Sequence, residues 1–256
     1  MTGDMTDSLI EIARKAGEEI LHHYRNGGHS DSDIEWKDDN SPLTKADLAA
    51  HHVIVDALRE LTPEIPIISE EGGIAEYEER SGWERFWLVD PLDGTKEFIK
   101  RNGEFTVNIA LIEDSRPVFG VVHIPDQGTT YFGDKDRGAF RIDSDGSRHR
   151  IYSRYADRDM PLTVVSSRSH GSDDLEEKLA GHGVTIGKKI PAGSSLKFCL
   201  VAEGKADLYP RLGPTMEWDT AAGDAVFRYS GKDGPRLSPL TYNKKDLRNG
   251  HFIIGL

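Results

Sequence analysis

Residues 87–95 read Trp-Leu-Val-Asp-Pro-Leu-Asp-Gly-Thr. The apolar run predicts a buried strand that ends at Asp90, and the proline and glycine after it favour a turn. Such a turn lets the carboxylates of Asp90 and Asp93 converge, with the Leu92 carbonyl between them. Two carboxylates held close repel each other, and a hard cation such as magnesium, which prefers oxygen ligands, relieves that conflict. The alternative is a plain strand-ending turn, because Asp, Pro and Gly all favour turns.

Acidic residues also stand at two other places where a predicted element ends or begins. Glu70 and Glu71 directly follow a short apolar run that has the character of a buried strand. Asp219 opens a predicted helix. Considered separately, Asp219 fits a helix cap and the two glutamates fit solvated surface charge. Neither segment alone indicates a metal site.

The rest of the chain alternates helical and strand patterns. Apolar residues recur at helical spacing over 7–24 and 45–61, and the polar residues 26–41 between them predict a loop. Short apolar runs predict strands at 65–69, 86–89, 105–112, 117–123, 129–132 and 139–142, with an acidic surface segment at 71–83. Beyond residue 155 the pattern predicts strands at 162–165 and 207–209 and helices at 172–181, 194–203 and 219–229.

These patterns predict an α+β fold in two parts. Residues 1–155 would form a mostly antiparallel sheet with flanking helices and carry the acidic motifs around the 87–95 segment. Residues 156–256 would form a smaller mixed α/β layer that supplies Asp219. The length allows one large domain or two small ones that share a core, and no linker marks the boundary near residue 155.

Composition narrows the class of protein. The 256 residues carry 32 Lys and Arg against 44 Asp and Glu, so the formal charge is −12. This balance argues against a nucleic-acid polymer as partner, since such proteins present a basic surface. The single cysteine, Cys199, cannot form an intrachain disulfide and lies in an apolar helical run, where we expect a core residue. The absence of a long apolar run or signal pattern predicts a cytoplasmic protein.

Three motifs together resemble one superfamily. The acidic pair at 70–71, D-P-L-D-G-T at 90–95 and W-D at 218–219 have the order and spacing found in the inositol monophosphatase and fructose-bisphosphatase superfamily. Longer runs are similar to its bacterial 3′(2′),5′-bisphosphate nucleotidases of the CysQ type. These runs are residues 87–112, S-P-L-T-K-A-D at 41–47, S-S-R-S-H at 166–170 and G-S-S-L-K-F-C-L-V-A-E-G at 193–204. The resemblance covers almost the whole chain and implies a layered α-β-α-β-α sandwich.

The resemblance also implies a reaction and a set of metal ligands. It implies removal of the 3′-phosphate from adenosine 3′,5′-bisphosphate, giving AMP, with 3′-phosphoadenylyl sulfate as a second substrate. It implies two or three Mg²⁺ ions and inhibition by lithium. The implied ligands are Glu70, Asp90, the Leu92 carbonyl, Asp93 and Asp219. Glu71 ranks below Glu70 as a ligand.

The remaining implied roles concern water and substrate. Thr95 and Asp47 would orient the attacking water, and Glu70 would share in catalysis, although Thr44-Lys45-Ala46-Asp47 also fits a helix start. The reacting phosphate would contact Leu92, Asp93, Gly94, Thr95 and Asp219. The resemblance points to Ser167, His170, Gly193, Lys197 and Arg211 for the nucleotide, with Lys197 and Arg211 near its second phosphate. Lys197 could equally be a solvated lysine.

Two other functions compete with this one. The first is an inositol monophosphatase or a sugar bisphosphatase of the same superfamily. The second is a catalytically silent protein that binds phosphate or metal, which would be expected to have lost a ligand that this chain keeps. Attachment to the inner face of the bacterial membrane is known in such proteins, but no basic or amphipathic anchor is seen here.

Overall fold

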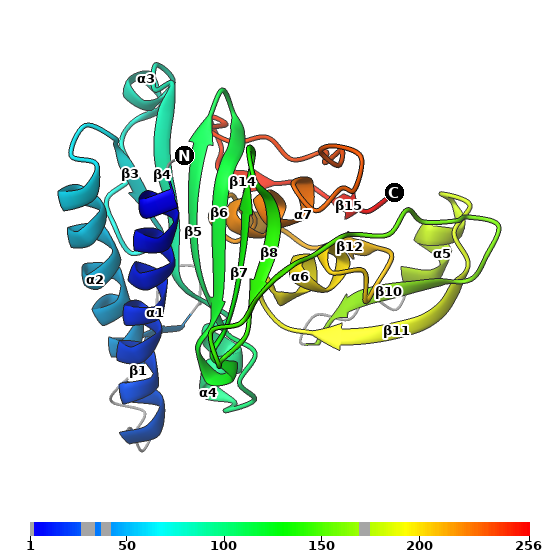
Figure 1. The fold of residues 1–256 in the computed structure, drawn as a ribbon, viewed down its shortest axis with the longest axis horizontal. Coiled ribbons are helices and arrows are strands. Elements are labelled where there is room, and N and C mark those ends of the chain that lie inside the picture. Colours follow the sequence, from blue (N-terminus) through cyan, green and yellow to red (C-terminus); the bar gives the residue numbers. More distant parts are fainter. Residues whose placement is uncertain (1–2, 27–33, 37–41, 169–174) are drawn as a thin grey trace.

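The computed structural model describes residues 3–26, 34–36, 42–168 and 175–256. A seven-stranded sheet forms its centre, in the order β3-β4-β5-β6-β7-β8-β9 (Figure 1). All neighbours in it are antiparallel except β3 and β4, which run parallel. Its strands are β3 (Ile67–Ser69), β4 (Arg85–Asp93), β5 (Thr106–Glu113), β6 (Arg116–Ile124), β7 (Thr129–Asp134), β8 (Gly138–Ile142) and β9 (Arg148–Arg150).

The two faces of this sheet are both covered, because alternate residues of its strands are apolar on each side. On one face, Trp87, Val89 and Ile109 belong to a core shared with α1 (Gly3–Asn26) and α2 (Lys45–Leu61). On the other, Leu88 and Ala110 belong to a core shared with α6 (Leu196–Ala202) and α7 (Ala221–Arg228). Figure 1 shows the two helix layers on opposite sides of the sheet.

A smaller β layer lies beyond α6. In it β10 (Leu162–Ser167) pairs parallel with β11 (Ile186–Ala192), and a bridge joins Val164 to Leu208, just before β12 (Tyr209–Arg211). β12 pairs antiparallel with β15 (Phe252–Ile254). The outer helix α5 (Leu175–Ala180) packs on β10 through Leu175 and Leu179. The order of layers is therefore α-β-α-β-α, which confirms the predicted fold class.

Short elements complete the described chain. They are β1 (Ile34–Trp36), β2 (Pro42–Thr44), α3 (Tyr77–Arg80), α4 (Thr95–Ile99), the 3₁₀ turn η2 (Pro125–Gln127), β13 (Thr215–Met216) and β14 (Arg248–Asn249). None of the described helices has the length and apolarity needed to cross a bilayer.

Several sequence-based expectations need correction. The predicted loop 26–41 contains β1, which pairs with β2. The acidic segment 71–83 is not simply a surface excursion: it forms α3, and buried Arg80 donates hydrogen bonds to Asn243 and to the carbonyls of Lys244 and Lys245. Strands β9, β11, β13, β14 and β15 were not predicted, because they are short or strongly polar. The described part of the predicted helix 172–181 is α5.

Candidate metal and substrate site

A bulge at the end of β4 places two aspartates on one face of the sheet. Asp90 pairs with Asn108 of β5, and Asp93 pairs with Thr106, so three steps along β4 match two along β5. In a regular strand, residues three apart point to opposite faces, and one extra residue restores them to the same face. The bulge therefore turns both carboxylates toward α6 and α7, while Leu92 enters the core on the α1 and α2 side.

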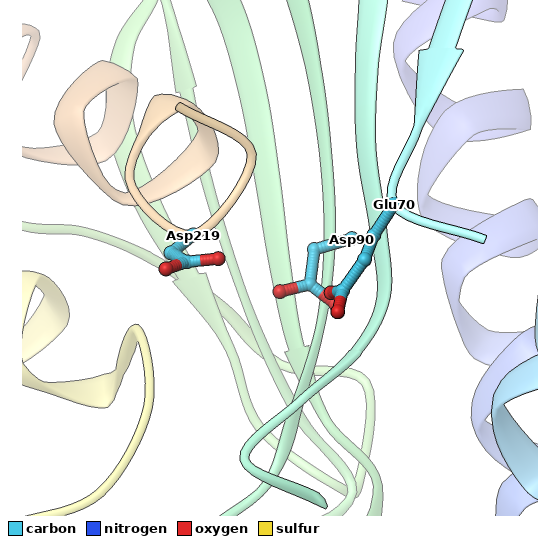
Figure 2. Close-up of side chains that lie close together, drawn as sticks. All are labelled: Glu70, Asp90 and Asp219. Carbon is cyan, nitrogen blue, oxygen red and sulfur yellow. The ribbon is translucent and has the colours of Figure 1, made fainter. Parts of the chain in front are cut away.

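Two further carboxylates arrive from separate elements. Glu70 follows β3, and its N–H donates to the Val89 carbonyl at 3.0 Å, which places it beside Asp90 at the same end of two parallel strands. Asp219 lies just before α7. Figure 2 shows Asp219 facing Glu70 and Asp90, and one oxygen from each of the three lies within 4.8 Å of the others. Asp93 and Glu71 are not part of this close group.

The Asp219 carboxylate does not cap the helix that follows it. Its Oδ2 accepts the Met216 N–H at 2.8 Å, and its backbone carbonyl accepts the Ser195 hydroxyl at 2.8 Å. The residue at the cap position of α7 is Thr220, whose side chain makes no capping hydrogen bond. The cap interpretation is therefore wrong, and Asp219 is held by the turn before the helix.

Burial and mutual repulsion both disfavour charge on these carboxyl groups. Burial first, and then the charges of Glu70 and Asp93, raise the pKa of Asp90 well above its ordinary value. Burial, and then Asp93 and Glu70, do the same to the pKa of Asp219. Without a cation, these close and largely buried carboxyl groups cannot all be ionised. Such a set of oxygen donors suits a hard divalent cation, which would stabilise their charged forms.

Asp93 is held by polar residues of β5. Its Oδ2 lies 3.3 Å from Asn108 Nδ2 and 3.5 Å from the Thr106 hydroxyl. Asn108 also donates to the Ser195 hydroxyl at 3.0 Å. The network thus connects the end of β4 with the turn before α6 and, through Ser195, with Asp219. Burial raises the pKa of Asp93, and nearby Lys197 opposes that rise.

Asp47 serves as a helix cap and as a site residue at once. Its Oδ2 accepts the Thr44 N–H at 2.8 Å while the Thr44 side chain accepts the Asp47 N–H, which forms a capping box at the start of α2. The Thr44 hydroxyl also donates to the same Oδ2 at 2.6 Å. Its Oδ1 accepts the Thr95 hydroxyl at 3.3 Å. The side chain is buried, and burial raises its pKa to about 7 although the Thr44 hydrogen bonds lower it.

A conformation that favours glycine joins β4 to α4. Gly94 has φ 92°, in the left-handed region, and a Cβ there would collide with the Ser194 hydroxyl oxygen. The residue after it, Thr95, begins α4 and places its hydroxyl 3.4 Å from the Leu92 carbonyl. A side chain at position 94 would therefore force apart the two turns that meet at the site.

One pocket of about 250 Å³ collects most of the predicted site. We call Glu70 and residues 90–95 its β4 side. We call Ser167, residues 193–197, Tyr209 and Arg211 its α6 side. Asp219 is assigned to neither side, because it is close to Glu70 and Asp90 and is also hydrogen-bonded to Ser195. The lining includes the predicted residues Glu70, Asp90, Leu92, Asp93, Gly94, Thr95, Ser167, Gly193, Lys197, Arg211 and Asp219. Asp47 reaches the pocket through Thr95, and His170 lies outside the described residues.

Lys197 is not the solvated lysine of the alternative interpretation. Only 5% of it is exposed, and its ammonium donates to the Ser194 carbonyl at 2.6 Å. Burial lowers its pKa to about 8, and the charge of Asp93 opposes that shift. Arg211 shares the same wall, where its Nη2 donates to the Pro214 carbonyl at 3.0 Å. The pocket thus holds acidic groups on one side and basic groups on the other.

Sequence reasoning missed the residues that hold the functional ones. Asn108 and Thr106 interrupt an otherwise apolar strand on one face only, a polar pattern that could have revealed them. The Ser194 hydroxyl bonds to the carbonyls of residues 93 and 104, and the Ser195 hydroxyl to that of residue 219; these partners are distant in the chain, and no local signal indicates them.

Comparison with known proteins places the chain in a family. The sequence model of the inositol monophosphatase family matches residues 2–249. A 3′(2′),5′-bisphosphate nucleotidase CysQ of Escherichia coli O6:H1 is 52% identical over 227 residues, which cover 89% of this chain and 88% of that protein. The crystal structure of CysQ from Bacteroides thetaiotaomicron, a bacterial member of the inositol monophosphatase family, superposes with a TM-score of 0.80 at 43% identity, covering 98% and 96% of the two chains.

A more distant structure shares the fold alone. The inositol monophosphatase from Anabaena gives a TM-score of 0.70 at 22% identity and covers 99% of this chain and 92% of its own. The family match spans both sides of the pocket and the strands and helices that position them. This chain belongs to the inositol monophosphatase family.

Proposed function

We propose that this protein hydrolyses the 3′-phosphate of adenosine 3′,5′-bisphosphate to give AMP and phosphate, with magnesium as cofactor. 3′-Phosphoadenylyl sulfate is the proposed second substrate. The observation that carries the proposal is the pocket itself, where three close carboxylates stand across from a buried lysine. The names of the nucleotidase relatives, at 52% and 43% identity, support the choice of substrate.

The metal would be held by oxygen atoms of the β4 side and of Asp219. The proposed ligands of the two or three ions are the carboxylates of Glu70, Asp90, Asp93 and Asp219 and the carbonyl of Leu92. Bound there, magnesium supplies positive charge against the phosphoryl oxygens and lowers the pKa of water. The protein contributes the fixed positions of these donors, because β3 and β4 are locked in one sheet.

Thr95 and Asp47 would orient the water that attacks phosphorus. The Thr95 hydroxyl donates to Asp47 Oδ1, so its lone pairs can accept a hydrogen bond from that water. A carboxyl group with a pKa near 7 suits the transfer of a proton at neutral pH, and Asp47 Oδ1 is the proposed proton acceptor. Its second oxygen stays fixed by Thr44, which keeps the first in place.

The α6 side would recognise the part of the substrate that does not react. The reacting phosphate would lie against Gly94 and Thr95, beside the carboxylates. The second phosphate would pair with Lys197 and Arg211, which a small monophosphate cannot reach at the same time. Ser167 and Gly193 line the same pocket and are proposed to contact the nucleotide. His170 is proposed from sequence alone.

The competing functions are less well supported. All residues proposed for the metal and for water are present, which argues against a silent binding protein. Buried Lys197 has no evident purpose for a substrate with one phosphate, which argues against inositol monophosphatase activity as the main function. We retain residues 1–155 and 156–256 as proposed domains, although α6 and α7 of the second share a core with the sheet of the first. The cytoplasm remains the proposed location.

Phosphate release tests the proposal. Wild type and Asp93→Asn would be assayed on adenosine 3′,5′-bisphosphate and on inositol 1-phosphate, with and without magnesium. We expect rapid magnesium-dependent release from the nucleotide and its loss in the variant. A preference for inositol phosphate would keep the metal chemistry and overturn the substrate. No release from either, in folded protein with magnesium, would favour the silent binding protein.

A further inference from the structure

Glu104, in the segment between α4 and β5, joins residues from both parts of the chain. Arg168 donates to it in a bidentate ion pair, from Nε to Oε2 at 2.7 Å and from Nη2 to Oε1 at 2.6 Å. Its Oε2 also accepts the Gly193 N–H at 2.8 Å. Only 16% of the Glu104 side chain is exposed, although its partner Arg168 is 43% exposed, so the carboxylate is held mainly on its inner side, where it accepts the Gly193 N–H.

Glu104 also contacts a strained turn, here through its backbone carbonyl. Ser194 has φ 47°, a backbone conformation that costs energy for any residue except glycine. Its hydroxyl lies 2.9 Å from the Asp93 carbonyl and 2.8 Å from the Glu104 carbonyl, so it bridges the two parts of the chain. A Cβ at Gly193 would lie only 2.8 Å from that same Glu104 carbonyl. Strain of this kind persists only where the surroundings hold it in place. Here the Asp93 and Glu104 carbonyls hold the Ser194 hydroxyl, and the Glu104 carboxylate holds the adjacent Gly193 N–H.

The Gly193–Ser194 turn leads into α6, which carries Lys197 on the α6 side of the pocket. The Ser194 carbonyl accepts the Lys197 ammonium at 2.6 Å, so the place of that carbonyl determines where the charge stands. The Ser194 hydroxyl donates a hydrogen bond to the carbonyl of Asp93, which belongs to the β4 side of the pocket. The distance between the α6 side and the β4 side therefore depends on how the Gly193–Ser194 turn is held, by the Ser194–Asp93 hydrogen bond and by the contacts with Glu104.

We propose that Glu104 is a positioning residue. With Arg168, it holds the Gly193–Ser194 turn against the end of β4 and so sets the distance between Lys197 and the carboxylates of the β4 side. This inference rests on the proposed function in one respect: a fixed spacing matters for a substrate with two phosphates. Glu104 itself contacts neither substrate nor metal in this scheme. Its loss should weaken substrate binding and leave the chemical step largely intact.

The test compares Glu104→Gln with a matched control. Glutamine keeps the shape and one acceptor but loses the charge that pairs with Arg168. The control is Glu176→Gln, which removes the same charge from an exposed ion pair with Lys189 at 2.7 Å, away from the pocket. Two readouts are taken: hydrogen exchange of the 190–198 segment without substrate, and KM and kcat for adenosine 3′,5′-bisphosphate with magnesium.

We expect Glu104→Gln to speed exchange of the Gly193–Lys197 amides and to raise KM about tenfold, with kcat within about twofold and no change in the melting temperature beyond a few degrees. The control should match wild type. Adding Arg168→Gln to Glu104→Gln should change KM little further, because the pair acts as a unit.

Two results would overturn the proposal. Unchanged exchange and unchanged KM in Glu104→Gln would show that the turn does not depend on this contact. A fall of kcat in step with the melting temperature would show a general structural role in its place. If wild type does not hydrolyse the nucleotide, the proposed function fails, and hydrogen exchange still decides whether Glu104 holds the turn.

Discussion

The two sides of the pocket are built in different ways. The β4 side stands at the end of a buried strand that is paired on both flanks and covered by a core on each face. The α6 side consists of the end of β10, a turn, the first turn of a seven-residue helix and a three-residue strand. Individual hydrogen bonds hold it in place, from the Ser194 hydroxyl to the Asp93 carbonyl on the β4 side and from the Gly193 N–H to the Glu104 carboxylate.

This difference suggests a division of labour. Asp90 and Asp93, two of the proposed metal ligands, stand on the sheet, where the backbone ladder fixes them, and Glu70 directly follows β3. Groups that select the substrate stand on a turn, which can change in sequence without disturbing the sheet. We therefore expect changes on the β4 side to affect turnover most strongly, and changes on the α6 side to affect substrate preference.

The largest effect is expected for Asp90→Asn. Phosphate release should fall on the order of 10²- to 10³-fold, because one metal ligand is lost. Without divalent ions the unfolding free energy should rise, by about 1 kcal/mol, because one of several repelling buried carboxyl groups is gone. Steady-state kinetics and urea unfolding in chelator would measure the two effects.

The control for this variant is Asp134→Asn on β7. That carboxyl is equally buried, and its Oδ1 accepts the N–H groups of Asp136 and Arg137, which asparagine can still accept. Activity should be retained. Equal loss of activity in both variants, or a less stable Asp90→Asn protein, would contradict the division between the two sides.

Magnesium should stabilise the folded protein by binding to the carboxylates of the β4 side and of Asp219. At a concentration about 100 times its Kd, a ligand that binds only the folded state adds roughly 2.7 kcal/mol to the unfolding free energy. Because the pKa values of Asp90 and Asp219 are raised, protons compete with the ion, and its apparent affinity should rise with pH. Melting curves across magnesium concentrations at several pH values, with sodium chloride as control, would check this. The same stabilisation in Asp90→Asn would exclude these ligands.

On the α6 side, Lys197→Met should change preference more than turnover. We expect kcat/KM for adenosine 3′,5′-bisphosphate to fall about 10- to 100-fold, since a charge-assisted contact to the second phosphate is lost. Inositol 1-phosphate, if it is hydrolysed, should change only a few-fold. An equal fall for both substrates would place Lys197 in the chemistry and not in selection.

The pH profile gives a second view of the same lysine. The ammonium form exists below the pKa, which burial lowers to about 8. In wild type, kcat/KM for the bisphosphate should therefore decline as pH rises through about 8. The decline should be absent in Lys197→Met, and its persistence there would assign it to another group.

The smallest effect on activity is expected far from the pocket, at His123 of β6. Burial lowers its pKa to about 4, and its Nδ1 lies 2.9 Å from the Thr130 hydroxyl. The unfolded chain, with a pKa near 6.5, binds the proton first as pH falls. Stability should thus drop by about 3 kcal/mol between pH 6.5 and pH 4. Urea unfolding should show a shallower drop for His123→Gln, with activity at pH 7 retained. An equally steep drop would exclude His123 as its cause.

The β4 side could be predicted from sequence because its signals are local. An apolar strand, a turn and the acidic residues at the strand ends lie within short segments, and the predicted second helix matches α2 at both ends. Buried Cys199 was also expected, as part of an apolar helical run. What composition and spacing could not supply was the identity of the substrate, which came from the resemblance.

The contacts of the α6 side could not be predicted because they join distant parts of the chain. Strand β11, Ile-Gly-Lys-Lys-Ile-Pro-Ala, is too polar to be recognised by alternation, and it is a strand because β10 lies beside it. The ion pair between Glu104 and Arg168 spans 64 residues. One feature of the β4 side was also beyond prediction: the bulge that brings Asp93 to the same face of the sheet as Asp90 depends on the register with β5, which no local pattern encodes.

A crystal structure of the Asp47→Asn variant with magnesium and adenosine 3′,5′-bisphosphate would test the central claim most directly. The account predicts the 3′-phosphate and the metal at Glu70, Asp90, Asp93 and Asp219, and the 5′-phosphate at Lys197 and Arg211. A 3′-phosphate on the α6 side, or a nucleotide bound without contact to Lys197, would contradict it.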